Sequence, residues 1–586
     1  MREWERYFPY SLRPEQDTIM NSILNTNSKH IILEAPAGYG KSICVLSSML
    51  LKGRILWVVR TGTETNRPIE ELKKIVKKNG QRILGISYRG RMDMCLIAEK
   101  YGTNLSWREA SLICYTIKCK YRQLEKIREI ANNINEPLTY NEIKEIAKTQ
   151  GVCPYYLQRE LAQKSRVISL SYNYVFDKRI GNEVSDLGEY LVIDEAHNLV
   201  DVLVELNSRQ IHKSTIERAV KEARGSEIKD YLIKIVEWFN TSNHGVARQT
   251  NNFPLDFDIV DIIAQMGENI IKESIESGRE IRSALISVAS FLETYRDSAE
   301  KVLIIYPGEN PSVEIFNIAI TEMLSTLWAR YKQVVLMSGT FGPIDAYCET
   351  IGIRNFIHLR PKYTIKDSNI LSIILNDLST RGAELPISMT QRYIEAICMF
   401  EHAMTPRNTA IFTPSYRIMN QLLDVGLEKN ISSCRKILIV EHPEMSMEDV
   451  ESYIKIMTKE NGITLLGVAG GRFSEGVDFP GSALDGVFLV GVPYSQKTPR
   501  VDALINYYSS LYGPDKGWEY AYGYPAIRKA VQALGRPLRA PDDRAVLVCG
   551  DYRYIQRKAL LPEYFKFAKI IEYTAIEKLI FNFYNV

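Results

Sequence analysis

The most constraining feature of the chain is a glycine-rich segment that follows an apolar stretch and ends in Lys-Ser. Residues 31–42 read I-I-L-E-A-P-A-G-Y-G-K-S. This order predicts a strand that runs into a turn and then into a helix. Glycines let backbone N–H groups point at phosphate oxygens, and the N-terminus of a helix attracts the same anion. The segment therefore predicts a phosphate-binding loop, although Ala35 replaces the first glycine of the usual pattern.

The residues of this loop have separate expected roles. Lys41 would reach the β- and γ-phosphates, and the Ser42 hydroxyl would bind Mg²⁺. The backbone that would cradle the phosphates belongs to Ala37, Gly38, Tyr39 and Gly40. A glycine turn without this role is the alternative, but strand, turn and Lys-Ser all occur in the required order.

A second apolar stretch ends in two adjacent acidic residues. Residues 190–197 read Y-L-V-I-D-E-A-H. Two carboxylates at the end of a buried strand are costly unless a cation lies beside them. Asp194 would bind Mg²⁺ through its water shell, and Glu195 would orient or deprotonate the attacking water. Loop and acids together predict binding and hydrolysis of a nucleoside triphosphate, but they do not indicate what hydrolysis drives.

A third motif lies near the C-terminus, where residues 532–539 read Q-A-L-G-R-P-L-R. Arg536 and Arg539 are three residues apart, so on a helix they share one face. Aimed across a cleft, they would neutralise charge on the transferring γ-phosphoryl group, and we group Gln532 with them as catalytic. Alone, the motif would be read as an exposed basic turn of helix. Beside the two upstream motifs, it predicts the second half of a nucleotide site.

The pattern of the whole chain predicts an α/β protein with two parallel-sheet domains. Strand-like runs alternate with helical runs in residues 1–90, return at 167–170 and 191–193, and alternate again over residues 409–548. Strands separated by helices are typical of parallel α/β sheets. Residues 206–300 read as helices instead, and residues 302–306 with 313–318 read as a hairpin.

Composition excludes several classes of protein. The 586 residues carry a net charge of only +3, so any nucleic-acid site must be a local groove. No apolar run reaches the roughly 18–20 residues of a membrane span, so we expect no membrane partner and a cytoplasmic location. Nine cysteines, an odd number, argue against a disulfide framework.

On these motifs the chain resembles the XPD-type helicases of superfamily 2, the group that also holds the DinG and FANCJ-like enzymes. The matching segments are residues 8–16, 35–42, 60–61, 194–197, 338–343, 412–416, 474–479, 532–539 and 551–554. Residues 62–64 read Gly-Thr-Glu, where the family usually has His-Ser-Gln. Residues 205–315 lack a recognisable motif, so the rest of the chain carries the resemblance.

The resemblance implies two RecA-like motor domains with the nucleotide between them. The first would comprise residues 1–90, 165–205 and 315–345, and the second residues 346–586. An iron–sulfur domain (91–164) and a mostly helical arch domain (206–314) would interrupt the first. ATP would close the cleft, and hydrolysis would open it.

Four cysteines between the first two motifs form a candidate metal site. The four are Cys95, Cys114, Cys119 and Cys153, with 18, 4 and 33 residues between successive cysteines. Four thiolates can hold an iron–sulfur cluster or a tetrahedral zinc, and spacing alone does not choose. Zinc sites favour two close pairs, and here only one pair is close. The resemblance implies a [4Fe–4S] cluster, with Cys119 the least secure ligand because its gap is unusually wide.

Other site residues follow from the resemblance alone. Gln16 would read the adenine, and Asp478 would lie in the nucleotide site. The residues that would contact DNA are Arg60, Thr61, Arg91, Tyr172, Tyr174 and Tyr416.

The resemblance implies an ATP- and Mg²⁺-dependent DNA helicase that acts as a monomer on single-stranded DNA and forked duplex. Family polarity implies 5′→3′ translocation, and the family role implies nucleotide excision repair, with repair-protein partners unknown. An archaeal source is expected, because the chain lacks the longer C-terminal region of eukaryotic relatives. The alternatives are a DinG-like structure-specific helicase, an ATP-hydrolysing DNA-binding scaffold that does not unwind, and a small-molecule kinase.

Overall fold

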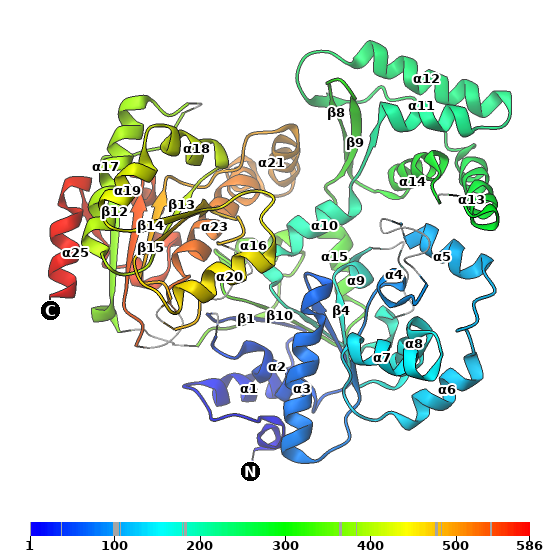
Figure 1. Cartoon of the computed structure of the whole chain (residues 1–586), viewed down its shortest axis with the longest axis horizontal. Helices are drawn as coiled ribbons and strands as arrows, with labels where there is room; N and C mark the ends of the chain where they lie inside the picture. The colour runs from blue at the N-terminus through cyan, green and yellow to red at the C-terminus, as the bar shows by residue number, and fades with distance from the viewer. Residues whose placement is uncertain are drawn as a thin grey trace.

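The computed structural model describes residues 2–36, 38–97, 105, 107–177, 180, 184–279, 281–361, 366–382, 384–474, 479–481, 483–538 and 542–585. Three of the predicted site residues, Ala37, Asp478 and Arg539, lie outside this part of the chain. Figure 1 shows two α/β lobes side by side, with a third, mostly helical part projecting from one of them.

The first lobe is built on a seven-stranded parallel sheet with the order β11-β1-β10-β5-β2-β4-β3. Its strands are β1 (His30–Glu34), β2 (Ile55–Val59), β3 (Gly85–Ser87), β4 (Val167–Ser171), β5 (Tyr190–Ile193), β10 (Gln333–Ser338) and β11 (Ile357–Leu359). Every residue of β2 and β10 is buried, as expected for strands covered by helices on both faces. The main helices of this lobe are α1 (Gln16–Asn25), α2 (Lys41–Met49), α3 (Asn66–Asn79), α10 (Leu199–Asn207), α15 (Ile320–Trp328) and α16 (Ile344–Thr350).

The second lobe repeats this architecture with a second seven-stranded parallel sheet, in the order β14-β15-β13-β16-β17-β12-β18. Its strands are β12 (Ile370–Leu375), β13 (Thr409–Thr413), β14 (Ile437–Val440), β15 (Ile463–Val468), β16 (Gly486–Val490), β17 (Ala545–Gly550) and β18 (Lys569–Ile571). Helices of this lobe include α17 (Ile387–Met404), α18 (Tyr416–Asp424), α21 (Pro499–Tyr512), α22 (Pro514–Trp518) and α23 (Tyr524–Leu534). The two sheets confirm the predicted fold class of two RecA-like parallel-sheet domains.

Two insertions separate strands of the first sheet. The first lies between β3 and β4 and is helical, with α4 (Arg91–Met94), α5 (Trp107–Thr116), α6 (Leu124–Asn133), α7 (Tyr140–Gln150) and α8 (Pro154–Lys164). The second lies between β5 and β10 and follows α10. Its helices are α11 (Lys213–Glu222), α12 (Ser226–Ser242), α13 (Val260–Ser277) and α14 (Ala284–Asp297).

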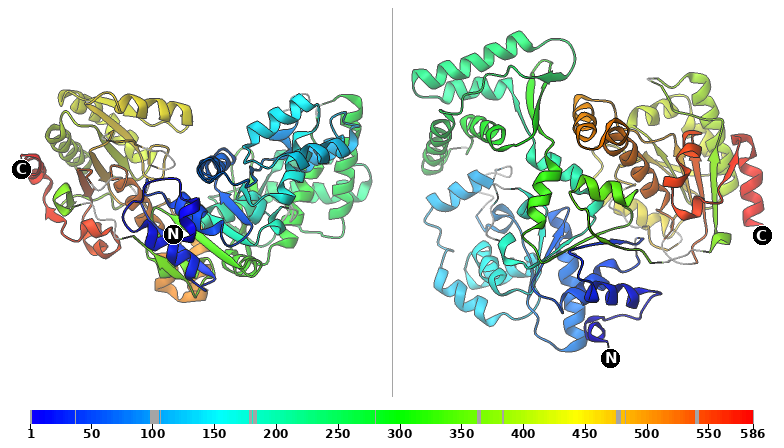
Figure 2. Two further views of the ribbon diagram at one scale, coloured as in Figure 1. Left: turned by 90° about the horizontal axis from the view of Figure 1, so that it is seen from below. Right: turned by 180° about the vertical axis from the view of Figure 1, so that it is seen from behind.

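The second insertion also contains a four-stranded sheet with the order β6-β9-β8-β7, in which each neighbouring pair is antiparallel. The strands are β6 (Arg209–His212), β7 (Arg248–Thr250), β8 (Lys301–Tyr306) and β9 (Ser312–Asn317). The β8–β9 pair is the hairpin predicted from the sequence. This sheet carries the helices α11–α14 away from the first lobe, as the right-hand view of Figure 2 also shows.

The two insertions meet through the ion pairs of Arg108 and through an apolar cluster that includes Ile113 of α5, Ile271 of α13 and Ile286 of α14. Arg108 on α5 donates hydrogen bonds to Glu268 on α13 (3.1 Å) and to Glu293 on α14 (3.1 Å). Charge-assisted bonds of this kind fix two elements in register. The two insertions are therefore joined far from the sheet that carries both of them.

Strand β11 pairs with β1, so the first sheet continues beyond residue 345, where the sequence had suggested the boundary between the lobes. Within the described residues, no helix combines the length and apolar character that crossing a membrane would require. All nine cysteines are described, and none of them forms a disulfide bond.

Candidate nucleotide site

The glycine-rich loop lies between β1 and α2, as the sequence predicts. Gly38 and Gly40 have φ values of 75° and 91°, a region that L-residues rarely adopt. A Cβ atom at Gly40 would lie 2.8 Å from Nε2 of Gln16, so the position requires glycine on two counts. Helix α2 begins at Lys41, which directs its N-terminus and its free N–H groups at the loop.

The side chain of Lys41 folds back over this loop. Its Nζ donates hydrogen bonds to the carbonyl oxygens of Ala35 (2.8 Å) and Pro36 (3.1 Å). An ammonium held there is a ready partner for phosphate oxygens, which would replace weaker carbonyl acceptors with charged ones.

Gln16 holds the phosphate loop through a side-chain hydrogen bond to its backbone. Its side chain is buried, with Nε2 donating to the Tyr39 carbonyl (2.7 Å) and Oε1 accepting from the Arg13 backbone (2.9 Å). Arg13 also donates to the carbonyl of Gly38, a contact that sequence reasoning missed. The segment before α1 is therefore tied directly to the phosphate loop.

The acidic pair follows β5 at the same edge of the sheet. Because the strands are parallel, their carboxyl ends meet there, and β10 alone separates β5 from β1. His197 Nδ1 lies 3.2 Å from a Glu195 carboxylate oxygen and 2.7 Å from the Ser338 hydroxyl, at the end of β10. The segments after β1, β5 and β10 thus form one connected site.

The two carboxylates have opposite pKa shifts. Burial, reinforced by the neighbouring Glu195, raises the pKa of Asp194 above its usual range. Burial also acts to raise the pKa of Glu195, but the hydrogen bond and charge of His197, together with the charges of Lys41 and Arg536, outweigh it and lower this pKa. Glu195 thus favours the ionised form, while Asp194 is a partly buried acid that a divalent cation would help to ionise.

A cavity of about 1880 Å³ runs between the two lobes and contains this site. From the first lobe it is lined by Lys41, Ser42, Asp194 and Glu195, and from the second by Gln532 and Arg536. Arg536 Nε donates to the Ser474 carbonyl (2.7 Å), and the charge of Arg536 helps to lower the pKa of Glu195. The structure thus brings residues nearly 500 positions apart in the sequence to one crevice.

Comparison with known proteins agrees with this arrangement. Residues 57–216 match the family model DEAD_2, and residues 400–566 match the model of the helicase C-terminal domain. The ATP-dependent DNA helicase XPD of Sulfolobus acidocaldarius is 27% identical over 93% of this chain and 96% of its own length. The chain belongs to the XPD-type helicase family.

A further relative and two solved structures are also similar to this chain over most of its length. The XPD/RAD3 helicase subunit of a general transcription and DNA repair factor of Saccharomyces cerevisiae is 22% identical over 95% of this chain and 88% of its own. Two solved structures, titled XPD_Helicase and XPD_APO, have TM-scores of 0.66 and 0.63 at 22% and 23% identity. They cover 100% and 95% of this chain and 98% and 99% of their own, and they share its fold.

The residues that the XPD-type resemblance assigns to DNA lie in different settings. Arg60 and Thr61 are exposed where β2 ends, and Thr61 forms a capping box with Glu64. Tyr172 is fully buried, and its hydroxyl donates to the Asp194 carbonyl (2.7 Å). Arg60 and Thr61 therefore face solvent, whereas Tyr172 does not.

The remaining aromatic candidates also have protein partners. Tyr174 packs edge-on against Tyr88, with ring centroids 5.2 Å apart. Tyr416, at the start of α18 in the second lobe, donates from its hydroxyl to Glu441 (2.7 Å). Both rings are partly exposed.

The four candidate cysteines are half-buried in the first insertion. Burial raises the pKa of the Cys153 thiol to about 11, and Cys114 and Cys119 are near enough to add to this rise. Cys114 Sγ lies 4.0 Å from the Tyr156 hydroxyl. In the part of the chain that the structure describes, no three His, Cys, Asp or Glu side chains are arranged as a metal site.

Arg91 lies beside these cysteines. Its guanidinium carbon is 4.2 Å from the centroid of the Tyr155 ring, and its Nη1 is buried without a hydrogen-bond partner among the described residues. A buried cationic donor with spare capacity suits a neighbouring group of negative charge, as an iron–sulfur cluster on four thiolates would be. The environment of Arg91 would suit such a cluster, although in the described residues the four cysteines are not arranged around one point as its ligands.

Two further residues were missed by sequence reasoning, Tyr347 and Arg528, both of which bind the backbone of the acidic motif. Arg528 precedes Gln532 by four residues and Arg536 by eight, a helical spacing that was visible in the sequence. No comparable signal marked Tyr347, because its partner is more than a hundred residues away.

Proposed function

We propose that this chain is an ATP- and Mg²⁺-dependent DNA helicase that translocates 5′→3′ on single-stranded DNA and unwinds forked duplex as a monomer. The cavity shared by Lys41, Asp194, Glu195 and Arg536 is the observation that carries the proposal. A triphosphate bound between two lobes couples its hydrolysis to their opening and closing. The names of the relatives, which include DNA repair helicases, support a role in nucleotide excision repair.

Each side chain has a role in this proposal. Lys41 binds the β- and γ-phosphates, Ser42 and Asp194 hold Mg²⁺, and Glu195 orients the attacking water. Mg²⁺ would supply positive charge against the phosphate oxygens. Gln532 and Arg536 line the cavity from the second lobe, where they would stabilise charge that develops during transfer, and the resemblance gives Arg539 the same role.

The DNA path is proposed to pass between the two insertions and the motor lobes. Arg108, which ties α5 to α13 and α14, supports a closed ring of protein around one strand. Stacking in duplex DNA averages about 1.4 kcal/mol per step, which hydrolysis of one ATP exceeds. Arg60, Thr61 and Arg91 are the first residues to test for strand contacts, followed by the three tyrosines.

The test is unwinding of a 5′-tailed duplex by the wild type and by Lys41→Ala. We expect the wild type to separate the strands with ATP and Mg²⁺, and the variant to lose both hydrolysis and unwinding, because the phosphates lose their main cation. Hydrolysis without strand separation by the wild type would favour a DNA-binding scaffold. Preference for R-loops over forks and bubbles would favour a DinG-like enzyme.

We also propose that Cys95, Cys114, Cys119 and Cys153 hold a [4Fe–4S] cluster. A Cys95→Ser variant is expected to lose bound iron and unwinding but to retain part of its ATP hydrolysis, since the nucleotide cavity contains none of these cysteines. The measurements are iron content, visible absorption, hydrolysis and strand separation. Cys549→Ser, in the buried strand β17, is the matched control and should keep its iron. Stoichiometric zinc without iron in the wild type would contradict the cluster.

A further inference from the structure

The loop that carries the acidic motif is bound by three side chains from three different parts of the fold. Tyr172 donates to the Asp194 carbonyl, Tyr347 to the Ala196 carbonyl, and Arg528 Nη1 to the His197 carbonyl at 2.9 Å. The first two belong to the first lobe. Arg528 lies on α23 and brings the only one of these three bonds that crosses between the lobes.

This loop requires such support because of its backbone. Glu195 has a φ of 47°, in the left-handed region that non-glycine residues enter only at an energetic cost. A conformation of this kind persists only where its surroundings determine it. The carboxylate of Glu195 takes its direction from this backbone and from His197, so a bond to the His197 carbonyl acts on the carboxylate's position.

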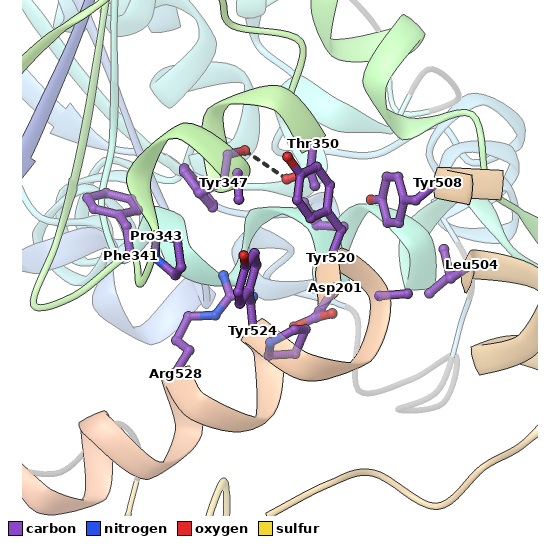
Figure 3. Close-up of a pocket in the computed structure, with 14 residues that line it drawn as sticks. Asp201, Phe341, Pro343, Tyr347, Thr350, Leu504, Tyr508, Tyr520, Tyr524 and Arg528 are labelled. Atoms are coloured by element: carbon purple, nitrogen blue, oxygen red, sulfur yellow. Dashed lines mark hydrogen bonds between the residues drawn. The ribbon is translucent and has the colours of Figure 1, made fainter. Parts of the chain in front are cut away.

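Arg528 reaches the loop through a close aromatic interface beside the nucleotide cavity. Figure 3 shows Arg528 extending from α23 next to Tyr524, with Phe341, Pro343 and Tyr347 of the first lobe opposite. The space left between the lobes here is only about 50 Å³, too small for a nucleotide. This interface is therefore a packed contact that opens only if the lobes separate.

The same helix continues into the nucleotide cavity. Arg528 and Gln532 are four residues apart on one face of α23, and Arg536 follows in the turn just after the helix ends at Leu534. One helix and the turn at its end thus contact both the acidic loop and the phosphate crevice.

We propose that Arg528 is a positioning residue that completes the geometry of Glu195 only when the two lobes are together. Separation of the lobes would remove the bond to His197 and loosen the loop at the moment when Arg536 withdraws. Hydrolysis is thereby confined to the closed state. The inference rests on the proposed ATP hydrolysis but does not require unwinding.

The test compares Arg528→Ala, Arg528→Lys and the neighbouring control Lys529→Ala in the full chain. We expect kcat for ATP to fall about 10–100-fold in Arg528→Ala, the range typical of lost supporting contacts, with little change in KM. Arg528→Lys, which keeps one donor, should recover part of the rate. Lys529→Ala should match the wild type. Equal kcat in Arg528→Ala and wild type would overturn the proposal.

A second measurement reports on the conformation of the acidic loop and does not depend on ATP hydrolysis. Hydrogen exchange at the Asn198 amide, which donates to the Glu195 carbonyl at 3.1 Å, should be faster in Arg528→Ala than in Lys529→Ala. Unchanged exchange, or a lowered unfolding temperature that accounts for the lost rate, would show a merely structural residue. A wild type that hydrolyses ATP without unwinding would refute the helicase proposal while leaving this test intact.

Discussion

A Glu195→Gln variant is expected to bind ATP as the wild type does and to hydrolyse it about 10²–10⁴-fold more slowly. The proposed role of this carboxylate is to orient the attacking water, and the neighbouring His197, Lys41 and Arg536 hold its pKa below the usual range, which favours the ionised form. Glutamine has the same shape but no charge, so it can fill the position without activating water. The measurements are ATP turnover and equilibrium binding of a fluorescent ATP analogue.

The matched control is Glu64→Gln, which changes a carboxylate that lines the same cavity but caps the turn at Thr61 instead of facing His197. Its turnover should stay near that of the wild type. A Glu195→Gln variant with normal turnover would remove Glu195 from the chemistry. A variant that no longer binds the analogue would instead indicate a role in binding.

A Lys436→Met variant is expected to lower the free energy of unfolding of the second lobe by about 3–5 kcal/mol. The side chains of Lys436 and Glu401 are both fully buried and form an ion pair between α17 and the start of β14. Thr409 and Thr464 also donate to the Glu401 carboxylate, at 2.7 Å and 2.9 Å. Removal of the ammonium leaves a buried carboxylate with only neutral donors, which costs more than the packing that methionine restores.

Hydrogen exchange at β13 and β15, which carry the two threonines, measures this loss in the lobe where it arises. The double variant Lys436→Met with Glu401→Leu removes both charges and should recover most of the lost stability. Lys459→Met, at an exposed position of the same lobe, should change stability by no more than about 0.5 kcal/mol. Equal exchange in Lys436→Met and wild type would contradict the prediction.

Much of the fold was predictable because its signals are local. Apolar runs such as residues 55–59 and 463–468 are long enough to be strands and too short to be helices, and both are strands of parallel sheets. The phosphate loop was predictable for the same reason, since strand, turn and helix are consecutive. The boundary between the lobes was less accessible, because β11 joins the first sheet by pairing with a strand more than 300 residues earlier.

In the nucleotide site, too, local features could be predicted from the sequence and long-range contacts could not. Lys41, Asp194, Glu195 and Arg536 were identified from motifs whose chemistry lies within a few consecutive residues. The contacts that hold them were not visible, since the bond from Arg528 to His197 joins positions 331 residues apart. The buried hydroxyl of Tyr172, a residue that the resemblance assigns to DNA, donates to the carbonyl of Asp194, and no local pattern indicated this bond.

The sequence by itself determined the two parallel sheets, the phosphate loop, the acidic pair and the family to which they belong, because spacing along one element fixes which residues share a turn or a face. Only the tertiary structure decided that Arg536 shares a cavity with Glu195, that Lys436 neutralises Glu401, and that Arg528 reaches the acidic loop. These contacts depend on how elements distant in the chain pack together, and packing is set by the shape of the whole molecule.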